Sequence, residues 1–303
     1  MKGFNKLVFG LIVFLVSGIS LSAQINIPLK TWMAVSLDSA NAPCLGGCKH
    51  MRLAHNPVNG LIYVLGGDHS GSTPGFSQSG RMEMYTYSIE TNEWIVEQPY
   101  CRTDGTPQPA GPDEIGWMYD SKRNTFWHNP GFNWDHGSNC PNSTVLRNEI
   151  MSYDPIAKVW KFENRTNIKE GTGVTPGNAR FGQYDPVEDT FVVFVGSKAN
   201  IYDITNDSWS QVSLSGLSQF GMTGDNYVAM DLENRITYIV ENRYIQRIFA
   251  YDMDAKSLTD LGPLPSNAAA HKEAQPHWDP INKVVLWPHW VDDENADILN
   301  LYV

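Results

Sequence analysis

The stretch IYDITNDSW, residues 201–209, recurs in this chain in four closely related forms. The other three are MYTYSIETNEW from Met84, IMSYDPIAKVW from Ile150 and IFAYDMDAKSL from Ile248. Each form reads as an apolar β-forming run, a short polar turn and the start of a second β-forming run. A unit that recurs in this way predicts a repeat architecture whose building block contains a β-hairpin.

A second pattern precedes these forms and occurs five times. It begins with Asp or Asn, continues through a short polar turn and ends in an apolar run, as in QYDPVEDTFVVFVG from Gln183. An Asp or Asn side chain caps such a turn, and a following Pro presets the backbone dihedral φ. We call the five Asp or Asn residues the turn anchors: Asn56, Asp120, Asp185, Asp231 and Asp279.

Successive turn anchors are 64, 65, 46 and 48 residues apart. The basic unit is therefore just under ~50 residues long, with insertions in the first two copies, and two hairpins in that length match the four strands of a β-propeller blade. The strand that ends at Gly66-Gly67, followed by the Tyr-x-Tyr and Thr-Asn-x-Trp of residues 85–94, resembles kelch-type β-propeller repeats, as in the central domain of galactose oxidase. The resemblance covers nearly the whole chain after residue 23, although the double glycine occurs only in the first copy.

The number of blades follows from counting hairpins. The chain holds five copies of the first hairpin but four of the second, because the fifth begins at Asp297 and the sequence stops at Val303. Residues 30–35, KTWMAV, supply one more β-forming segment, and an N-terminal strand that completes the last blade removes open sheet edges. We therefore expect an all-β fold, a five-bladed β-propeller of four-stranded blades whose ring is closed by the N-terminal strand. A longer natural chain, cut at Val303, is the alternative.

The first 23 residues have the pattern of a leader. Lys2 and Lys6 precede an apolar run over residues 7–21, and Leu21-Ser22-Ala23 offers small residues for cleavage. This pattern predicts a secretory signal peptide, since the run is shorter than the ~20 residues of a membrane span. We expect residues 24–303 to form a single propeller domain that is secreted or periplasmic, with no membrane insertion after cleavage.

Composition narrows the class of partner. The formal net charge is −11, from 22 Lys and Arg against 33 Asp and Glu, and an acidic surface disfavours nucleic acid and anionic membranes. The 10 Trp, 13 Tyr and 12 Phe are more typical of a β-sheet core than of a glycan-facing surface, although they suit both.

The resemblance also implies which end of the propeller is functional. In such rings the first strand of each blade lines a central channel, and the connections between strands two and three and between blades share one face. Here the hairpin turns on the opposite face are short, and elaborated loops on a rigid scaffold usually carry function. The long segments expected on the functional face are residues 66–83, 129–148 and 288–297 within blades, and residues 36–48, 97–113 and 163–178 between blades.

Candidate site residues gather on that face. The inner strands begin near His50, Glu114, Arg180 and His271, which we take as candidate catalytic residues at the channel mouth. His50 and His271 are also candidate ligands for a divalent metal ion, because imidazole suits several transition metals. The alternative is a solvent-filled channel with no catalytic or metal-binding role. The long loops add candidate ligand-binding residues: Asp68, His69, Arg81, Phe132, Trp134, Asp135, His136 and His289.

Three further features favour a structural interpretation. We expect His55 to pack in the core, because equivalent positions hold Tyr119, Tyr184 and Trp278. We expect His128 to be structural, because it occupies a strand position where other blades have Val. The acidic run over residues 292–297 has oxygen ligands that suit calcium, but it matches no EF-hand spacing and reads as a solvated loop.

Four cysteines in an exported chain favour disulfides, and the sequence allows three pairings. We favour Cys44–Cys48 and Cys101–Cys140, the latter because both residues fall on the face with the long loops. A zinc site is the weaker interpretation, since the chain has no C-x2-C pair.

These observations favour an exported propeller that recognises a glycan-like or other small polar ligand on the long-loop face. The alternative is a polysaccharide lyase-like or metal-dependent enzyme, in which Arg180 neutralises a uronate and His50 or His271 removes the α-proton. A hydrolase fits less well, because it needs paired carboxylates where this chain has His50 and Arg180. Oxidase activity does not follow from the fold alone. A protein-interaction scaffold is a further alternative. The sequence does not identify the ligand or the oligomeric state.

Overall fold

The computed structural model describes twelve segments of the chain: residues 52–65, 84–99, 116–129, 150–163, 165–166, 171–173, 182–195, 197–214, 226–241, 246–264, 276–293 and 296–302. The chain divides into two compact units, Met1–Val35 and Ser36–Val303. All of the described segments belong to the second unit.

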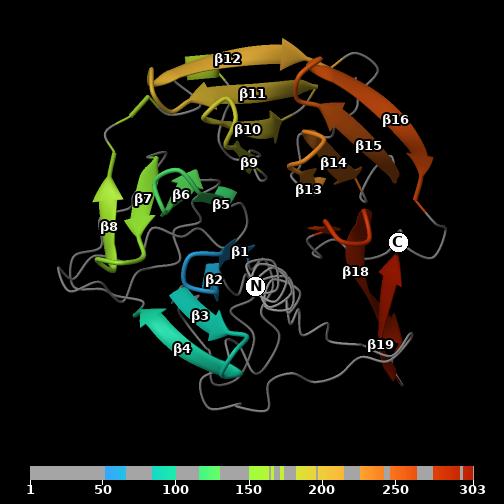
Figure 1. Ribbon diagram of the computed structural model, residues 1–303. Helices are drawn as coiled ribbons and strands as arrows, with labels where there is room; N and C mark the ends of the chain where they lie inside the picture. Colours follow the sequence, from blue (N-terminus) through green and yellow to red (C-terminus); the bar gives the residue numbers. More distant parts are fainter. Residues whose placement is uncertain are drawn as a thin grey trace, which may run out of the picture. The chain divides into compact units, whose positions relative to one another are not determined.

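The described segments contain five antiparallel sheets, and in each sheet the strands follow one another in chain order (Figure 1). The first sheet consists of β1 (Arg52–Asn56), β2 (Leu61–Leu65), β3 (Met84–Ser88) and β4 (Glu93–Gln98). The second consists of β5 (Gly116–Asp120), β6 (Thr125–Asn129), β7 (Met151–Asp154) and β8 (Val159–Phe162). The third consists of β9 (Gly182–Asp185), β10 (Thr190–Val195), β11 (Lys198–Asp203) and β12 (Ser208–Ser213). The fourth consists of β13 (Asn226–Asp231), β14 (Ile236–Glu241), β15 (Arg247–Asp252) and β16 (Ser257–Pro263), and the fifth of β17 (His277–Asp279), β18 (Val284–Asp293) and β19 (Ala296–Tyr302).

The first strands of the sheets lie next to one another. β1 contacts β5, β5 contacts β9, β9 contacts β13 and β13 contacts β17, with the last strand of each four-stranded sheet on the outside (Figure 1). This is an all-β propeller arrangement with four-stranded blades. Four complete blades are observed where we expected five. The fifth sheet has three described strands, and the predicted closing strand, residues 30–35, lies outside the described residues.

One predicted loop is wrong. We expected residues 288–297 to form a long connection, but β18 continues to Asp293 and β19 pairs with it from Ala296, with Pro288 opposite Leu301. The sequence around Pro288 is rich in Val and Trp, which favour extended structure. β17 pairs with β18 only over Val284–Leu286, so within the described segments Pro288 has a strand on one side, where its missing N–H is tolerated.

The turn anchors work as the sequence predicts. Asp120 Oδ1 accepts hydrogen bonds from the backbone N–H of Lys122 (2.9 Å) and of Arg123 (3.1 Å). The last residue of the same turn, Asn124, has a positive φ of 48°. The equivalent residues in the other blades also have positive φ: Gly60, Asp189, Arg235 and Lys283. Each inner hairpin is thus closed by a four-residue turn fixed by its own anchor.

The recurring Tyr and Trp are cross-strand partners at the outer hairpin. Tyr202 on β11 lies directly opposite Trp209 on β12, with ring centroids 4.9 Å apart. Tyr153 and Trp160 form the same pair at 5.2 Å, and Tyr87 and Trp94 at 4.8 Å. Aromatic pairs in this position stabilise antiparallel strands, which explains why the pattern recurs.

The core lies between neighbouring blades. Trp117 and Phe126 stack at 4.8 Å and pack with Tyr63 and Leu65 of the first blade. Because side chains alternate along a strand, the neighbouring Met118 instead packs toward the third blade. Equivalent apolar clusters join the second blade to the third and the third to the fourth. The second and third blades therefore bury apolar side chains on both of their faces.

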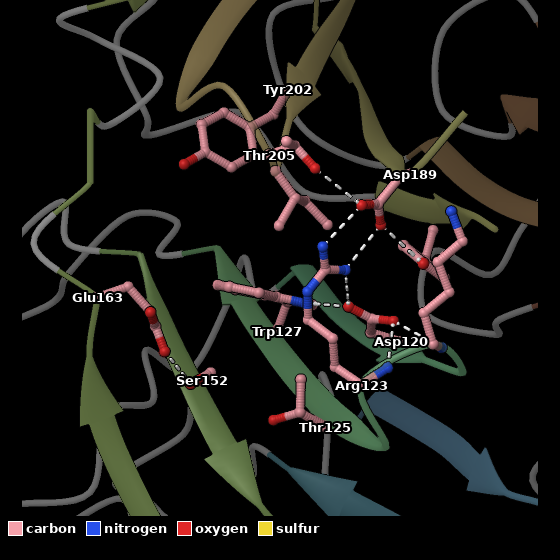
Figure 2. A network of polar contacts seen from close by, with 12 residues as sticks. Asp120, Arg123, Thr125, Trp127, Ser152, Glu163, Asp189, Tyr202 and Thr205 are labelled. Carbon is pink, nitrogen blue, oxygen red and sulfur yellow. Dashed lines mark hydrogen bonds and ion pairs between the residues drawn. The ribbon is translucent and has the colours of Figure 1, made fainter. Parts of the chain in front are cut away.

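Ion pairs join the same neighbours at the turn end (Figure 2). Arg123 Nη1 lies 2.7 Å from Asp120 Oδ2, and its two Nη atoms lie 2.7 and 2.6 Å from the carboxylate of Asp189 in the next blade. Trp127 Nε1 donates a second hydrogen bond to Asp120 Oδ2 at 3.0 Å. Arg123 also holds the pKa of Asp189 well below its usual range. The guanidinium of Arg123 thus pairs with the buried carboxylate of Asp120 in its own blade and with the carboxylate of Asp189 in the next blade.

At the next interface a buried aspartate is again paired with a guanidinium, which here comes from the following blade. Arg235 Nη1 lies 2.6 Å from Asp185 Oδ1 in the preceding blade, and Arg235 Nε lies 2.7 Å from Asp254 Oδ1. The side chain of Asp185 is 0% exposed and that of Arg235 is 12% exposed. A charge buried this completely needs its partner.

We predict that Arg235→Met lowers the free energy of unfolding by about 3 kcal/mol, because it leaves the Asp185 carboxylate buried without its cation. Arg247→Met is the matched control, since the Arg247–Asp260 pair on the outer strands is 39% and 45% exposed and such pairs contribute less than about 1 kcal/mol. Chemical denaturation of the two variants measures the difference. Equal losses would show that the Asp185–Arg235 pair does not join the blades.

Candidate functional site

Almost all of the predicted site residues lie outside the described segments. This holds for the four candidate catalytic residues and for every candidate loop residue except His289, whose backbone lies in β18 opposite Asn300. The residues outside the described segments are His50, Asp68, His69, Arg81, Glu114, Phe132, Trp134, Asp135, His136, Arg180 and His271, together with Cys44, Cys48, Cys101 and Cys140.

The strand boundaries nevertheless show how the two ends of the blades differ. Every inner and outer hairpin turn between described strands has four residues, as in residues 57–60 and 204–207. At the other end, residues 66–83 connect β2 to β3 and residues 130–150 connect β6 to β7, whereas residues 196–197 suffice between β10 and β11. The additional chain length is therefore concentrated at one end of the first two blades.

The described residues also form a cavity. It has a volume of ≈ 380 Å³ and is lined by residues from all five inner strands or their turns. We call it the channel cavity. Its lining comes from equivalent positions in each blade, from three residues before the turn anchor to one residue after it. The lining residues are Leu53, Ala54, His55, Pro57, Trp117, Met118, Tyr119, Ser121, Gln183, Tyr184, Pro186, Val228, Ala229, Met230, Leu232, Pro276, His277 and Trp278.

The channel cavity carries no charged side chain among these lining residues. The Tyr119 hydroxyl donates to Asn124 Oδ1 at 2.9 Å, and the Tyr184 hydroxyl donates to Asp189 Oδ1 at 3.0 Å. Burial raises the pKa of both tyrosines. His277 is exposed to the cavity, yet the protein around it removes enough water to lower its pKa below the ordinary 6.5. Among the described residues, the lining therefore brings no Asp, Glu, Lys or Arg side chain to the cavity.

The prediction for His55 is wrong. Its side chain is exposed and lines the channel cavity instead of packing in the core. The reason is that the residue before the turn anchor lines the cavity in all five blades. The equivalent residues are Tyr119, Tyr184, Met230 and Trp278. The aromatic residues at this position suggested a core, but the same pattern fits the lining of a cavity.

Metal binding finds no support among the described residues. Within these segments no three His, Cys, Asp or Glu side chains come together as a metal site. The candidate metal ligands His50 and His271 lie outside them, so the metal stays a prediction.

No helix in the described part of the chain is long and apolar enough to cross a membrane.

His128 is structural, as expected. Its side chain is 3% exposed, and its ring meets Trp160 edge-on with centroids 6.1 Å apart. Within the described part of the chain, neither ring nitrogen has a hydrogen-bond partner. Burial lowers the pKa of His128 to about 3, so the imidazole is neutral in the folded protein.

Comparison with known proteins gives the fold but no family. No protein-family description and no curated protein matches this sequence. Among solved structures, the chain is similar to YjhT, with a TM-score of 0.50 and 14% identity over 82% of this chain and 79% of that chain. It is also similar to an auxiliary nutrient binding protein from Bacteroides thetaiotaomicron, with a TM-score of 0.48 and 11% identity over 85% of this chain. The chain spans 57% of the length of that second protein.

We predict that His128 makes the protein sensitive to acid. Its pKa is about 3 when folded and 6.5 ordinarily, so as the pH falls from about 6.5 toward 3 the unfolded chain binds a proton that the folded chain excludes. Stability should decrease over this window by up to about 1.4 kcal/mol per pH unit. His128→Leu should reduce this slope in denaturation curves recorded at several pH values. Val193→Leu, at the equivalent position of the third blade, is the control and should retain it; an unchanged slope in His128→Leu would contradict the prediction.

Proposed function

We propose that this protein is an exported five-bladed β-propeller that recognises a glycan-like or other small polar ligand on the face with the long connections. Five copies of the turn anchor and five successive inner strands, β1, β5, β9, β13 and β17, support five blades. In this proposal residues 30–35 complete the fifth sheet. The leader pattern of residues 1–23 supports export.

The observation that carries the proposal is the asymmetry between the two ends of the blades. Four-residue turns, each fixed by its anchor, close the hairpins at one end. At the other end, residues 66–83, 99–115, 130–150 and 163–181 form long connections in or next to the first two blades. A rigid scaffold that carries long loops at one end is how many recognition surfaces are built.

The residues in these connections have the chemistry of sugar recognition. Phe132 and Trp134 offer flat apolar rings for the C–H face of a pyranose, while Asp68 and Asp135 offer carboxylates for hydroxyl groups. Pockets for small polar ligands combine aromatic surface with a few placed polar groups in this way.

The proposed disulfides fit the same purpose. Cys101 lies in the connection 99–115 and Cys140 in the connection 130–150, so a bond between them would join two long segments of the recognition face. Cross-linking restricts the unfolded chain and pre-organises a binding surface. A Cys44–Cys48 bond would close a short loop before β1.

We predict that the mature chain, residues 24–303, binds at least one polysaccharide on a glycan array, and that Phe132→Ala with Trp134→Ala weakens this binding about tenfold or more. Loss of a ring that stacks on the ligand removes about 1 kcal/mol or more. Ile156→Ala is the control, because Ile156 is 81% exposed in a turn at the opposite end. Isothermal titration calorimetry with the polysaccharide found on the array measures the change.

Two outcomes would replace the binding proposal. Undiminished polysaccharide binding after all loop aromatics are changed to Ala would show that the loops are not the recognition face. Formation of unsaturated uronate products, abolished by His50→Ala or Arg180→Ala, would establish lyase chemistry at the channel mouth instead. Metal content measured by inductively coupled plasma mass spectrometry, with and without His271→Ala, distinguishes a metal-dependent enzyme from a metal-free one.

A further inference from the structure

The channel cavity lies at the turn end of the inner strands. Its lining includes Pro57, Ser121 and Pro186, which begin the inner hairpin turns directly after the turn anchors. The long connections leave the sheets at the opposite strand ends. The cavity is therefore separate from the recognition face proposed above, and its size of ≈ 380 Å³ lies in the range of small-molecule sites.

Flat rings surround the cavity at one level. The residue immediately before the turn anchor is His55, Tyr119, Tyr184 or Trp278 in four of the five inner strands, and all four line the cavity. Trp278 is held by a stacking contact with Tyr238 of the fourth blade, with centroids 5.4 Å apart and planes 19° from parallel. Because the hydroxyl groups of the two tyrosines are already bonded to Asn124 and Asp189, these residues offer the cavity chiefly ring surface.

One residue earlier, the lining is small or polar in four blades, and it is Met118 in the second blade. Ala54 and Ala229 leave space beside the rings, while Gln183 and His277 bring an amide and a neutral imidazole to the same level. Gln183 Nε2 donates to the Val228 carbonyl at 3.3 Å, which leaves the amide oxygen as an acceptor. The cavity thus combines ring surface with hydrogen-bonding groups, as small-molecule sites do.

The electrostatics disfavour a negatively charged occupant. The buried turn anchors Asp120, Asp185 and Asp231 directly follow lining residues. Arg123 and Arg235 are engaged by carboxylates at 2.6–2.7 Å, and neither lines the cavity. An anion would meet nearby carboxylates without a free cation among the lining residues, and a neutral molecule avoids this repulsion.

The turns around this end are apolar as well. Val58, Val187, Leu232 and Ile281 are exposed there. Each belongs to an inner hairpin turn, and Leu232 itself lines the cavity. Exposed apolar side chains commonly mark a binding site, and one of these four, Leu232, belongs to the cavity lining.

We propose that the channel cavity is a second ligand site, which binds a small uncharged molecule with a flat apolar ring and one hydrogen-bonding group. The ring packs among the aromatic side chains before the turn anchors, and the polar group bonds with Gln183 or His277. This site goes beyond the proposed recognition of a polar ligand on the long-loop face and does not depend on it.

Two probes with the same ring test this proposal: indole, which is neutral, and indole-3-acetate, which is negatively charged. Isothermal titration calorimetry with the mature chain should show saturable indole binding and at least tenfold weaker binding of indole-3-acetate. Ala54→Phe, which fills the cavity from β1, should weaken indole binding at least tenfold. Ala255→Phe is the matched control, because Ala255 is exposed in an outer turn, and it should leave indole binding unchanged.

A second variant protects the test against misfolding. His277→Ala removes a polar group from an exposed side chain and should weaken indole binding severalfold without lowering the thermal unfolding temperature. Absence of saturable indole binding, equal binding of indole-3-acetate, or full binding by both Ala54→Phe and His277→Ala would overturn the proposal. Phe132→Ala with Trp134→Ala should leave indole binding intact, so the two proposed sites succeed or fail separately.

Discussion

The arrangement of the blades depends on a buried Asp or Asn at the end of each of the first four inner strands. Asn56, Asp120, Asp185 and Asp231 are almost completely buried, and an unpaired buried carboxylate would cost several kcal/mol. The backbone N–H groups of the anchor's own turn satisfy one side of the group. At Asp120 the guanidinium of Arg123 bonds to the other carboxylate oxygen and also reaches Asp189 of the next blade. At Asp185 the guanidinium of Arg235 bonds to the same oxygen as the turn N–H and also reaches Asp254. Local turn formation and blade-to-blade packing are therefore one interaction.

This coupling separates a rigid end from an end that is free to vary. Every four-residue turn carries a residue with positive φ in a fixed position, so an insertion there would disturb the anchor and its ion pair. Insertions are instead found at the other end, where residues 66–83 and 130–150 connect strands that are already paired on the rest of their length. The proposed recognition face and the channel cavity thus lie at opposite ends of the blades. One end tolerates long loops, and at the other end the fixed turns hold the aromatic residues before the anchors at one level around the cavity.

Most of the local structure could be predicted from the sequence, because the anchors and the Tyr–Trp pairs act within a single hairpin. The four-stranded blades and the short turns were predicted on this basis, although five complete blades were expected and four are observed. Features that depend on two blades could not be predicted. Arg123 reaches Asp189 across 66 residues of sequence, and His55 is exposed because five strands meet around a cavity. Residues 288–297 were predicted as a long connection between two strands of the fifth blade, whereas pairing with β19 makes residues 288–293 part of β18.

The last residue of each inner turn shows how the order of the blades is encoded. This residue needs only to tolerate positive φ, yet it differs in every blade, and its chemistry matches the blade before it. The neutral anchor Asn56 meets the neutral Asn124, with Asn56 Nδ2 donating at 3.0 Å. The anionic anchor Asp185 meets Arg235, and Glu233 of the fourth blade pairs with Lys283 of the fifth. At Asp189 both neighbouring residues are anionic, since the anchor of the preceding blade is Asp120. Arg123 of the preceding blade bonds to both carboxylates and so separates the two negative charges. Placing the second blade after the third would set the neutral Asn124 opposite Asp185 in place of Arg235, so a repeat with nearly uniform backbone geometry still favours particular neighbours.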